Sequence, residues 1–370
     1  MKCICDKVLL REALTNVSRV IATKSSIPAL EGVQLKAYGN TLTLTGYDME
    51  AGITTTIDAQ VLAEGEIVLP ARLFSDMIRK MAADDVTISV EEKLLTQIVS
   101  GAARFTIMGI ASEEFPELPR VEDGEGISIP QHKLKSMIEQ TLFAIAQTDT
   151  KPVHTGSLFD LADGKLNVVS VDGYRLALRS EVVGGDKTMS FVVPGKVLAE
   201  IVKLLKEDSE NPAILTVSKR HIVFSIDSYN VVSRLLEGEF LDYKVSIPKG
   251  CKTTVITNTR EFMEGVERAS LLISDRLRSP LRIFFDPQGS IQISCSTPLG
   301  KSYDEVGCTL QGEGVEMGFN NKYIMDALKA TGCDEVRLEL SGPLSPIKVL
   351  PLEGEEFLFL VLPVRLKHEG

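Results

Sequence analysis

The sequence lacks the features that mark several other classes of protein. No apolar run approaches the length of a transmembrane helix, and the first residues lack the long apolar core of a signal peptide. We therefore expect a cytoplasmic protein with no membrane partner. No glycine-rich loop followed by a lysine is present to hold a nucleotide phosphate, which argues against an ATPase.

Cysteine and histidine are few and scattered. The six cysteines form no CxxC pair and show no spacing typical of zinc ligands, so we interpret them as reduced packing residues. None of the four histidines stands in a metal or triad spacing. Adjacent acidic residues such as Asp84-Asp85 are more typical of turns than of paired catalytic carboxylates. The sequence thus predicts a protein without metal, cofactor or catalytic residues.

One short amphipathic helix is present in three copies. Each copy carries a base, an acid four residues later and a second base three residues after the acid. At the helical period these charges share one face, and apolar residues cover the other. The copies recur about every 125 residues, which predicts a threefold internal repeat. The pairs of bases are Arg72 with Arg79, Lys196 with Lys203, and Lys322 with Lys329.

Each repeat has nearly the same order of expected elements. A strand, an amphipathic helix, alternating strands, the basic helix and further strands follow one another. This order predicts an α+β fold, in which each domain has two helices on one side of an antiparallel sheet. We expect three domains, at residues 1–121, 122–249 and 250–370, with unpaired strands at the two ends of the row. In detail, residues 301–310 are expected to form one strand, and 239–243 a linker.

Positive charge gathers on the predicted helices. These helices are together net positive although the whole chain carries −11, so the strands and loops are strongly acidic. A basic surface attracts duplex DNA through counterion release, without reading its sequence. An alternative remains, because helix faces are commonly basic in proteins that bind no DNA.

Several motifs together resemble those of a known family. Residues 172–177 read Asp-Gly-Tyr-Arg-Leu-Ala, 114–116 read Glu-Phe-Pro, 239–240 read Glu-Phe, 318–320 read Gly-Phe-Asn, and 363–366 read Pro-Val-Arg-Leu. With the threefold repeat, they resemble the bacterial replicative sliding clamp, the beta subunit of DNA polymerase III, over the whole chain. The resemblance implies a head-to-tail homodimer that closes into a six-domain ring. Duplex DNA would pass through the ring, which tethers the replicative DNA polymerase.

The resemblance also implies three sets of functional residues. A pocket between the second and third repeats would take short peptides from the replicative polymerase, the clamp loader and repair polymerases. Its residues would be Val171, Gly173, Tyr174, Arg175, Leu176, Asn320, Tyr323, Leu344, Leu362, Pro363, Val364 and Arg365. DNA would meet the repeated bases and the loop residue Lys24. The dimer would form through Arg104, Phe105, Ile107, Leu271, Leu272, Asp304 and Glu305.

Some of these residues have a second interpretation. Phe105 and Ile107 fit an ordinary core equally well, and Asp172-Gly173 is also typical of a tight hairpin turn. Val153 and His154 depart from the residue types usual near the pocket, so its preference among peptides is expected to differ. Residues 367–370 extend past the usual end of the family.

Two other functional classes remain open on the sequence alone. One is a hydrolase with a cleft between repeats. The other is a repeat scaffold that binds proteins but not DNA. The threefold repeat favours a binding protein over the hydrolase, because no nucleophile motif accompanies it.

Overall fold

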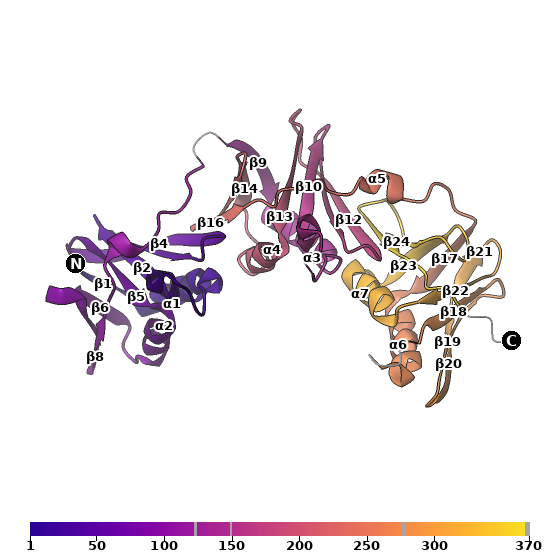
Figure 1. Ribbon diagram of the computed structural model, residues 1–370, viewed down its shortest axis with the longest axis horizontal. Helices are drawn as coiled ribbons and strands as arrows, with labels where there is room; N and C mark the ends of the chain where they lie inside the picture. Colours follow the sequence, from indigo (N-terminus) through magenta and orange to yellow (C-terminus); the bar gives the residue numbers. More distant parts are fainter. Residues whose placement is uncertain (122–123, 149, 275–278, 367–370) are drawn as a thin grey trace. The chain divides into compact units, whose positions relative to one another are not determined.

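The chain folds into two compact units. The computed structural model describes residues 1–121, 124–148, 150–274 and 279–366, and the predicted extension at 367–370 lies outside them. Unit 1 comprises residues 1–135 and 196–235, and unit 2 comprises residues 136–195 and 236–370 (Figure 1). Each unit is therefore assembled from two separate stretches of the chain.

Unit 1 is built on one twelve-stranded antiparallel sheet. Its main order is β8-β7-β6-β1-β4-β16-β15-β14-β9, and β3, β2 and β5 follow one another from β4. The strands are β1 (Lys2–Asp6), β2 (Gly32–Tyr38), β3 (Thr41–Tyr47), β4 (Ala51–Ala63), β5 (Gly65–Pro70), β6 (Asp85–Val90), β7 (Leu95–Ser100), β8 (Ala103–Met108), β9 (Glu125–Pro130), β14 (Pro212–Val217), β15 (His221–Ile226) and β16 (Tyr229–Arg234).

Unit 2 contains two antiparallel sheets. The nine-stranded sheet consists, in spatial order, of β13 (Met189–Pro194), β10 (Gly156–Ala162), β11 (Lys165–Val171), β12 (Arg175–Val182), β25 (Phe357–Val361), β24 (Ile347–Pro351), β23 (Glu335–Leu340), β17 (Thr253–Asn258) and β21 (Thr309–Gln311). The four-stranded sheet consists of β20 (Gly300–Gly307), β19 (Ser290–Thr297), β18 (Leu281–Asp286) and β22 (Val315–Phe319).

All six predicted helices are present, and most are shorter than predicted. They are α1 (Lys7–Val17), α2 (Ala71–Lys80), α3 (Gln131–Leu142), α4 (Gly195–Ile201), α6 (Thr259–Ala269) and α7 (Asn321–Thr331). Side chains cap several of their first turns: the Asp6 carboxylate accepts from the backbone N–H groups of Val8 and Leu9, and the Asn320 side chain accepts from that of Lys322. These caps are local, which is why the helix starts are readable from the sequence.

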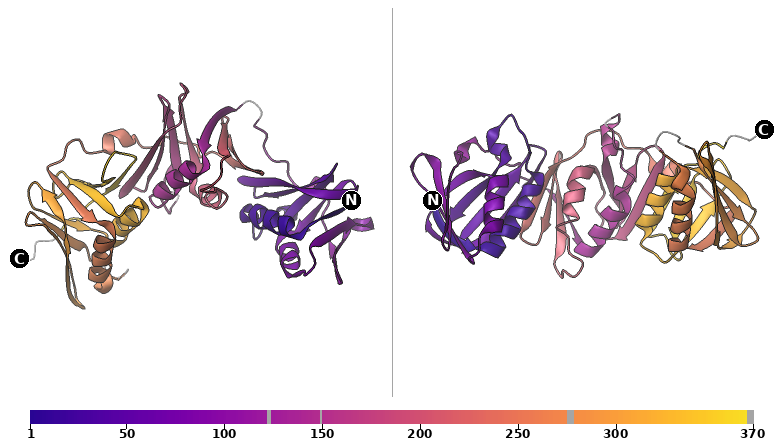
Figure 2. Two further views of the ribbon diagram at one scale, coloured as in Figure 1. Left: turned by 180° about the vertical axis from the view of Figure 1, so that it is seen from behind. Right: turned by 90° about the horizontal axis from the view of Figure 1, so that it is seen from below.

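Within each unit the paired helices lie side by side against sheet. Figure 2, in the view from below, shows α1 next to α2 and α6 next to α7, and both pairs are in contact. Their apolar faces supply fully buried side chains, including Leu10 and Phe74 in unit 1 and Phe262 and Leu328 in unit 2. Charged residues lie on the opposite face of each helix, as the helical spacing of apolar residues predicts.

The repeat extends to the register of the strands. The hairpin of β2 and β3 pairs Gln34 with Thr45, and the hairpin of β10 and β11 pairs Leu158 with Val169 at corresponding positions. Their turns correspond as well, because Gly39 and Asp163 both adopt a positive φ, of 57° and 52°. The first two repeats therefore share backbone geometry even where their side chains differ in polarity.

Three local expectations were wrong or incomplete. The strand expected over 301–310 is broken at Cys308, so that β20 pairs with β19 while β21 pairs with β17 in the other sheet. The Cys308 N–H bonds instead to the Gly289 carbonyl at 3.0 Å. The linker ends in a short helix, α5 (Tyr243–Ser246), capped by the Asp242 carboxylate. Strand β13, which pairs with β10, was not predicted.

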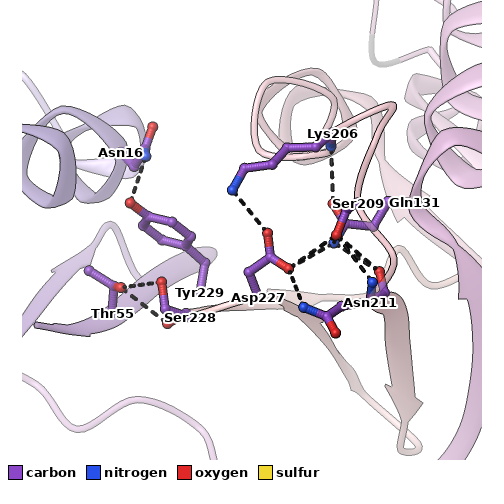
Figure 3. A network of polar contacts seen from close by, with 9 residues as sticks. All are labelled: Asn16, Thr55, Gln131, Lys206, Ser209, Asn211, Asp227, Ser228 and Tyr229. Atoms are coloured by element: carbon purple, nitrogen blue, oxygen red, sulfur yellow. Dashed lines mark hydrogen bonds and ion pairs between the residues drawn. The ribbon is translucent and has the colours of Figure 1, made fainter.

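A buried glutamine at the start of α3 holds several loops of unit 1. The Gln131 side chain is 0% exposed, and its amide nitrogen donates to Ser209 Oγ at 3.0 Å, the Asn211 carbonyl at 3.1 Å and Asp227 Oδ1 at 3.1 Å. Its oxygen accepts from the Lys206 N–H at 3.0 Å. Figure 3 shows these contacts together with the Lys206–Asp227 ion pair. Every polar atom of this buried amide is thus satisfied.

We predict that Gln131→Leu lowers the free energy of unfolding by about 2 kcal/mol, because the partners of the amide would lose their hydrogen bonds inside the protein. Urea unfolding followed by circular dichroism measures the change. The neighbouring exposed residue supplies the control, since His132→Ala is expected to change stability by about 0.5 kcal/mol or less. An unaltered urea midpoint in Gln131→Leu would contradict the role of this network.

Candidate nucleic-acid interface, peptide pocket and edge strands

The predicted DNA-contacting bases are all exposed. Lys24 lies in the loop before β2, and five bases lie on α2, α4 and α7, where the 3.6-residue period places them opposite the buried face. Lys203, expected on the same helix as Lys196, lies instead in the turn just after the end of α4 at Ile201. Outside α7, three of these bases form ion pairs. Arg79 contacts Asp76 at 2.6 Å and Lys203 contacts Glu200 at 2.8 Å, each three residues apart in the sequence, and Lys196 contacts Asp48 at 3.0 Å.

The acid of the repeated helix has a different partner on α7. Asp326 occupies the position of Asp76 and Glu200, but its Oδ2 accepts from Arg175 Nη1 at 2.7 Å. Among the described residues, neither Lys322 nor Lys329 forms an ion pair. Helix α7 therefore presents both of its repeated bases without a carboxylate partner.

Arg175 is the central residue of the predicted pocket. It begins β12 directly after the turn at Asp172-Gly173, where Gly173 adopts a φ of 90°. Its side chain is only 5% exposed and is held between Asp172 Oδ2, at 2.9 Å, and Asp326. Its guanidinium also lies over the rings of Tyr323, at 4.6 Å, and Phe143, at 5.4 Å. Arg175 is thus committed to contacts inside unit 2.

The C-terminal tail runs beside this arginine. The Leu362 N–H donates to the Tyr174 carbonyl at 2.9 Å, and the Val364 N–H donates to the Gly318 carbonyl at 2.8 Å. A Cβ at Gly318 would lie 2.6 Å from the Val364 carbonyl oxygen, so only glycine allows this approach. The turn before β12, the start of α7 and the tail are thereby brought together, as expected for the predicted pocket residues.

Apolar side chains are left exposed around Arg175. Tyr174 is 60% exposed and stacks on Tyr323 with ring centroids 5.8 Å apart, and Leu344, Leu362 and Val364 are also exposed. Arg365 is exposed, so it is the arginine of this set that is available at the surface. Val171 and Leu176, by contrast, are buried in an apolar cluster beneath. The site therefore combines a fixed polar centre with an open apolar rim.

The structure adds residues that were not in the predicted pocket. Leu241 and Val245, before and within α5, expose apolar side chains next to the cluster that contains Tyr243. His154 contacts Phe240 edge to face at 5.2 Å. Burial lowers the pKa of His154, and Lys151 lowers it further. The motif Glu239-Phe240 was the available signal for this segment, but its α5 turn was not anticipated.

Strand β8 is an edge of the unit 1 sheet and carries three of the predicted dimer residues. It pairs only with β7, so its outer backbone groups have no strand partner among the described residues. Phe105 is 37% exposed and Arg104 is exposed, while Ile107 is half-buried. Phe105 is thus not an ordinary core residue in this chain. Met108, which was not predicted, is 59% exposed on the same strand.

Strand β20 is an edge of the four-stranded sheet of unit 2. It pairs only with β19 among the described strands, and the short helix Ser270–Leu272 packs beside it. Leu271 is 79% exposed, and Leu299 and Tyr303 are two further exposed apolar side chains that were not predicted. The exposed surface of this edge thus combines apolar side chains with the charged residues Lys301 and Glu305.

Of the two predicted acids on β20, one is already paired. Asp304 Oδ2 lies 2.5 Å from Arg268 Nε, and this hydrogen bond holds the pKa of the Asp304 carboxyl below its usual range. Glu305 is exposed, and among the described residues its carboxylate accepts a single hydrogen bond, from the Tyr303 hydroxyl at 3.0 Å. Glu305 is therefore the carboxylate better placed to meet an incoming cation such as Arg104.

The described ranges contain neither a metal-binding cluster nor a membrane-spanning helix. No group of three or more His, Cys, Asp or Glu side chains in those ranges is arranged to hold a metal ion. Likewise, none of the described helices is both long enough and apolar enough to cross a membrane.

Comparison with known proteins decides the family. Three family models match consecutive parts of the chain: the N-terminal domain of the DNA polymerase III beta subunit at 1–119, its central domain at 128–242 and its C-terminal domain at 244–365. The chain belongs to this family. A relative from Bacillus subtilis named "Beta sliding clamp" is 32% identical over 99% of this chain and 100% of its own length. The function of the chain is accordingly that of a sliding clamp in DNA replication.

Solved structures agree in fold. The structure of the DNA polymerase sliding clamp from Bacillus subtilis matches with a TM-score of 0.96 at 31% identity, covering 99% of this chain and all of that one. That of a putative DNA polymerase III beta subunit from Eubacterium rectale matches with a TM-score of 0.94 at 33% identity and the same coverage. The predicted α+β fold of three repeated clamp domains is confirmed.

Proposed function

We propose that two copies of this chain associate head to tail into a ring of six domains. Support comes from the two edge strands, because β8 and β20 each offer backbone groups and exposed apolar side chains to a further strand. A head-to-tail contact uses two different surfaces, and it leaves neither β8 nor β20 as a free edge when the rotation closes. Arg104 would then meet Glu305, and Phe105, Ile107 and Met108 would meet Leu271, Leu272 and Tyr303.

Duplex DNA would pass through this ring against the exposed bases of the repeated helices. Lys24, Arg72, Arg79, Lys196, Lys203, Lys322 and Lys329 would contact phosphates only. Contacts of this kind carry no sequence information and exchange readily, which is what sliding requires. The observation that carries this proposal is that all seven of these bases are exposed in a chain whose net charge is −11.

The protein is expected to stay on nicked circular duplex DNA after loading by its clamp loader and ATP, and to be lost when the circle is linearised. Gel filtration of the DNA-bound fraction before and after cleavage measures the retention. A topological link depends on the closed circle, whereas adhesion to the surface of DNA does not. Equal retention on circular and linear forms would therefore contradict encirclement.

We predict that Leu271→Ala combined with Leu272→Ala raises the dimer dissociation constant at least about 100-fold, because a leucine side chain buried in the contact contributes roughly 1.5–3 kcal/mol and the ring contains the contact twice. Sedimentation velocity measures the shift from dimer to monomer. Val245→Ala is the matched control, since Val245 is 76% exposed but belongs to neither edge strand. A dimer of unchanged strength in the double variant would remove Leu271 and Leu272 from the interface.

The pocket around Arg175 would bind short peptides from the replicative polymerase, the clamp loader and repair polymerases. Its exposed rim of Tyr174, Leu344, Leu362 and Val364 can bury incoming leucine or phenylalanine side chains. Asn320, Pro363 and Arg365 would complete the rim. Arg365 would pair with a carboxylate or a carbonyl of the peptide. Val171, Gly173, Leu176 and Tyr323 would shape the floor.

Pro363→Ala combined with Arg365→Ala is expected to weaken binding of a peptide copied from the clamp-binding segment of the cognate polymerase at least tenfold. Both side chains belong to the tail, whose backbone stays anchored through Val364 and Gly318. Isothermal titration measures the affinity, and the variant should remain dimeric. Arg220→Ala, an exposed arginine of unit 1, is the control. Undiminished affinity in the double variant would exclude the pocket.

The chain would thus act as a processivity factor in the cytoplasm, without catalytic residues or cofactor of its own. It would tether enzymes to DNA through the pocket while the ring moves along the duplex. We also propose domain bounds of 1–121, 122–249 and 250–370. The ranges matched by the three family models support a threefold division of this kind.

A further inference from the structure

The three copies of the basic helix differ in how their charges are compensated. On α2 the acid Asp76 pairs with the second base, Arg79, and at the end of α4 the acid Glu200 pairs with Lys203 in the turn that follows the helix. These are contacts between residues three positions apart, which helical geometry favours. On α7 the same spacing separates Asp326 from Lys329, yet Asp326 pairs with Arg175 instead.

A turn that the first two repeats share explains part of this difference. It lies between β3 and β4 in the first repeat and between β11 and β12 in the second. Asp48 in the first repeat and Asp172 in the second occupy corresponding positions. Asp48 has an alanine, Ala51, three residues later, and it holds the first base of α4, Lys196, at 3.0 Å. Asp172 has Arg175 at that position and holds it at 2.9 Å. The turn of the first repeat therefore pairs directly with a base on α4, the basic helix of the next repeat. The turn of the second repeat instead pairs with Arg175, which in turn pairs with the acid of α7.

Asp326 would have bases within reach if Arg175 did not hold it. A cavity of about 310 Å³ beside α7 is lined by Lys322, Asp326 and Lys329. Glu267, an exposed acid of α6, lines the same cavity, but among the described residues it forms no ion pair with either lysine. Both lysines are exposed and lack an ion pair among the described residues, while the Asp326 side chain is about one quarter exposed, at 28%. Arg175, at 5%, is too buried to exchange its partners for solvent.

We propose that Arg175 is a positioning residue for the DNA-contacting surface. By holding Asp326 it keeps Lys322 and Lys329 free of a carboxylate on their own helix, so both lysines are available to phosphates. Helix α7 then provides two uncompensated repeated bases, whereas α4 provides none. This inference rests on the proposed contact of the repeated helices with DNA, and it links an arginine of the peptide pocket to the binding of duplex.

The test is the salt dependence of binding to a short duplex of about 30 base pairs, measured by fluorescence anisotropy. Each phosphate contact contributes about 0.9 to the slope of log K against log salt concentration. Arg175→Met is expected to lower this slope by about one contact, because the released Asp326 pairs with Lys329. Adding Asp326→Asn to Arg175→Met is expected to restore the slope. If Arg175→Met lowered the slope only by disturbing the fold, adding Asp326→Asn would not restore it.

Matched variants separate this inference from the proposed function. Lys322→Gln with Lys329→Gln should lower the slope by about two contacts, and Asp76→Asn should raise it by about one by freeing Arg79. If the lysine variant binds duplex as the wild type does, the proposed contact of α7 with DNA is wrong. If the lysine variant weakens binding but Arg175→Met retains the wild-type slope, Arg175 has no positioning role.

A measurement on the wild-type protein covers the case in which Arg175→Met does not fold. Free amines acetylate faster than amines held in an ion pair, so limited acetylation followed by mass spectrometry ranks the lysines. Lys322 and Lys329 are expected to react several-fold faster than Lys196 and Lys203 in the absence of DNA, and to be protected by duplex. Equal rates for the two pairs of lysines would overturn the inference.

Discussion

A buried guanidinium organises much of unit 2. Removing a charge from water costs several kcal/mol, and the cost is offset only when the charge is paired and hydrogen-bonded with good geometry. Arg175 meets this condition through Asp172, Asp326 and the face of Tyr323. Because these partners come from a β-turn and from α7, a single side chain fixes a hairpin against a helix. Loss of either carboxylate would leave the guanidinium with one ion pair and remove the hydrogen bond from one of its nitrogens.

That constraint has consequences in two directions. Toward the tail, it orders the turn whose Tyr174 carbonyl accepts from Leu362, so the apolar rim of the pocket has a rigid support. Toward α7, it occupies the one acid that helical geometry places beside Lys329. A similar fold in the first repeat has Ala51 where the second has Arg175, and there the acid of the turn meets Lys196 directly. One substitution between repeats thus changes the charge that a helix presents.

The sheet edges impose the second constraint on the chain. Unpaired backbone groups on an exposed strand favour addition of another strand, and proteins generally cover or interrupt such edges. Here β8 and β20 each end a sheet among the described strands. Both expose apolar side chains, such as Met108 on β8 and Tyr303 on β20. The proposed ring closure between two copies would satisfy both edges at once, and it is consistent with the family to which the chain belongs.

The sequence alone determined the features that depend on short-range patterns. Helix starts follow from caps such as Asp6 and Asn320, the basic faces follow from the 3.6-residue period, and the repeat follows from spacing. Only the tertiary structure decided which charges meet, because Arg175 and Asp326 are distant in the chain and no local pattern pairs them. The same holds for the break at Cys308, where a backbone bond to Gly289 ends a strand that the alternation would continue. Contacts of this kind depend on how separate segments pack, which periodicity does not encode.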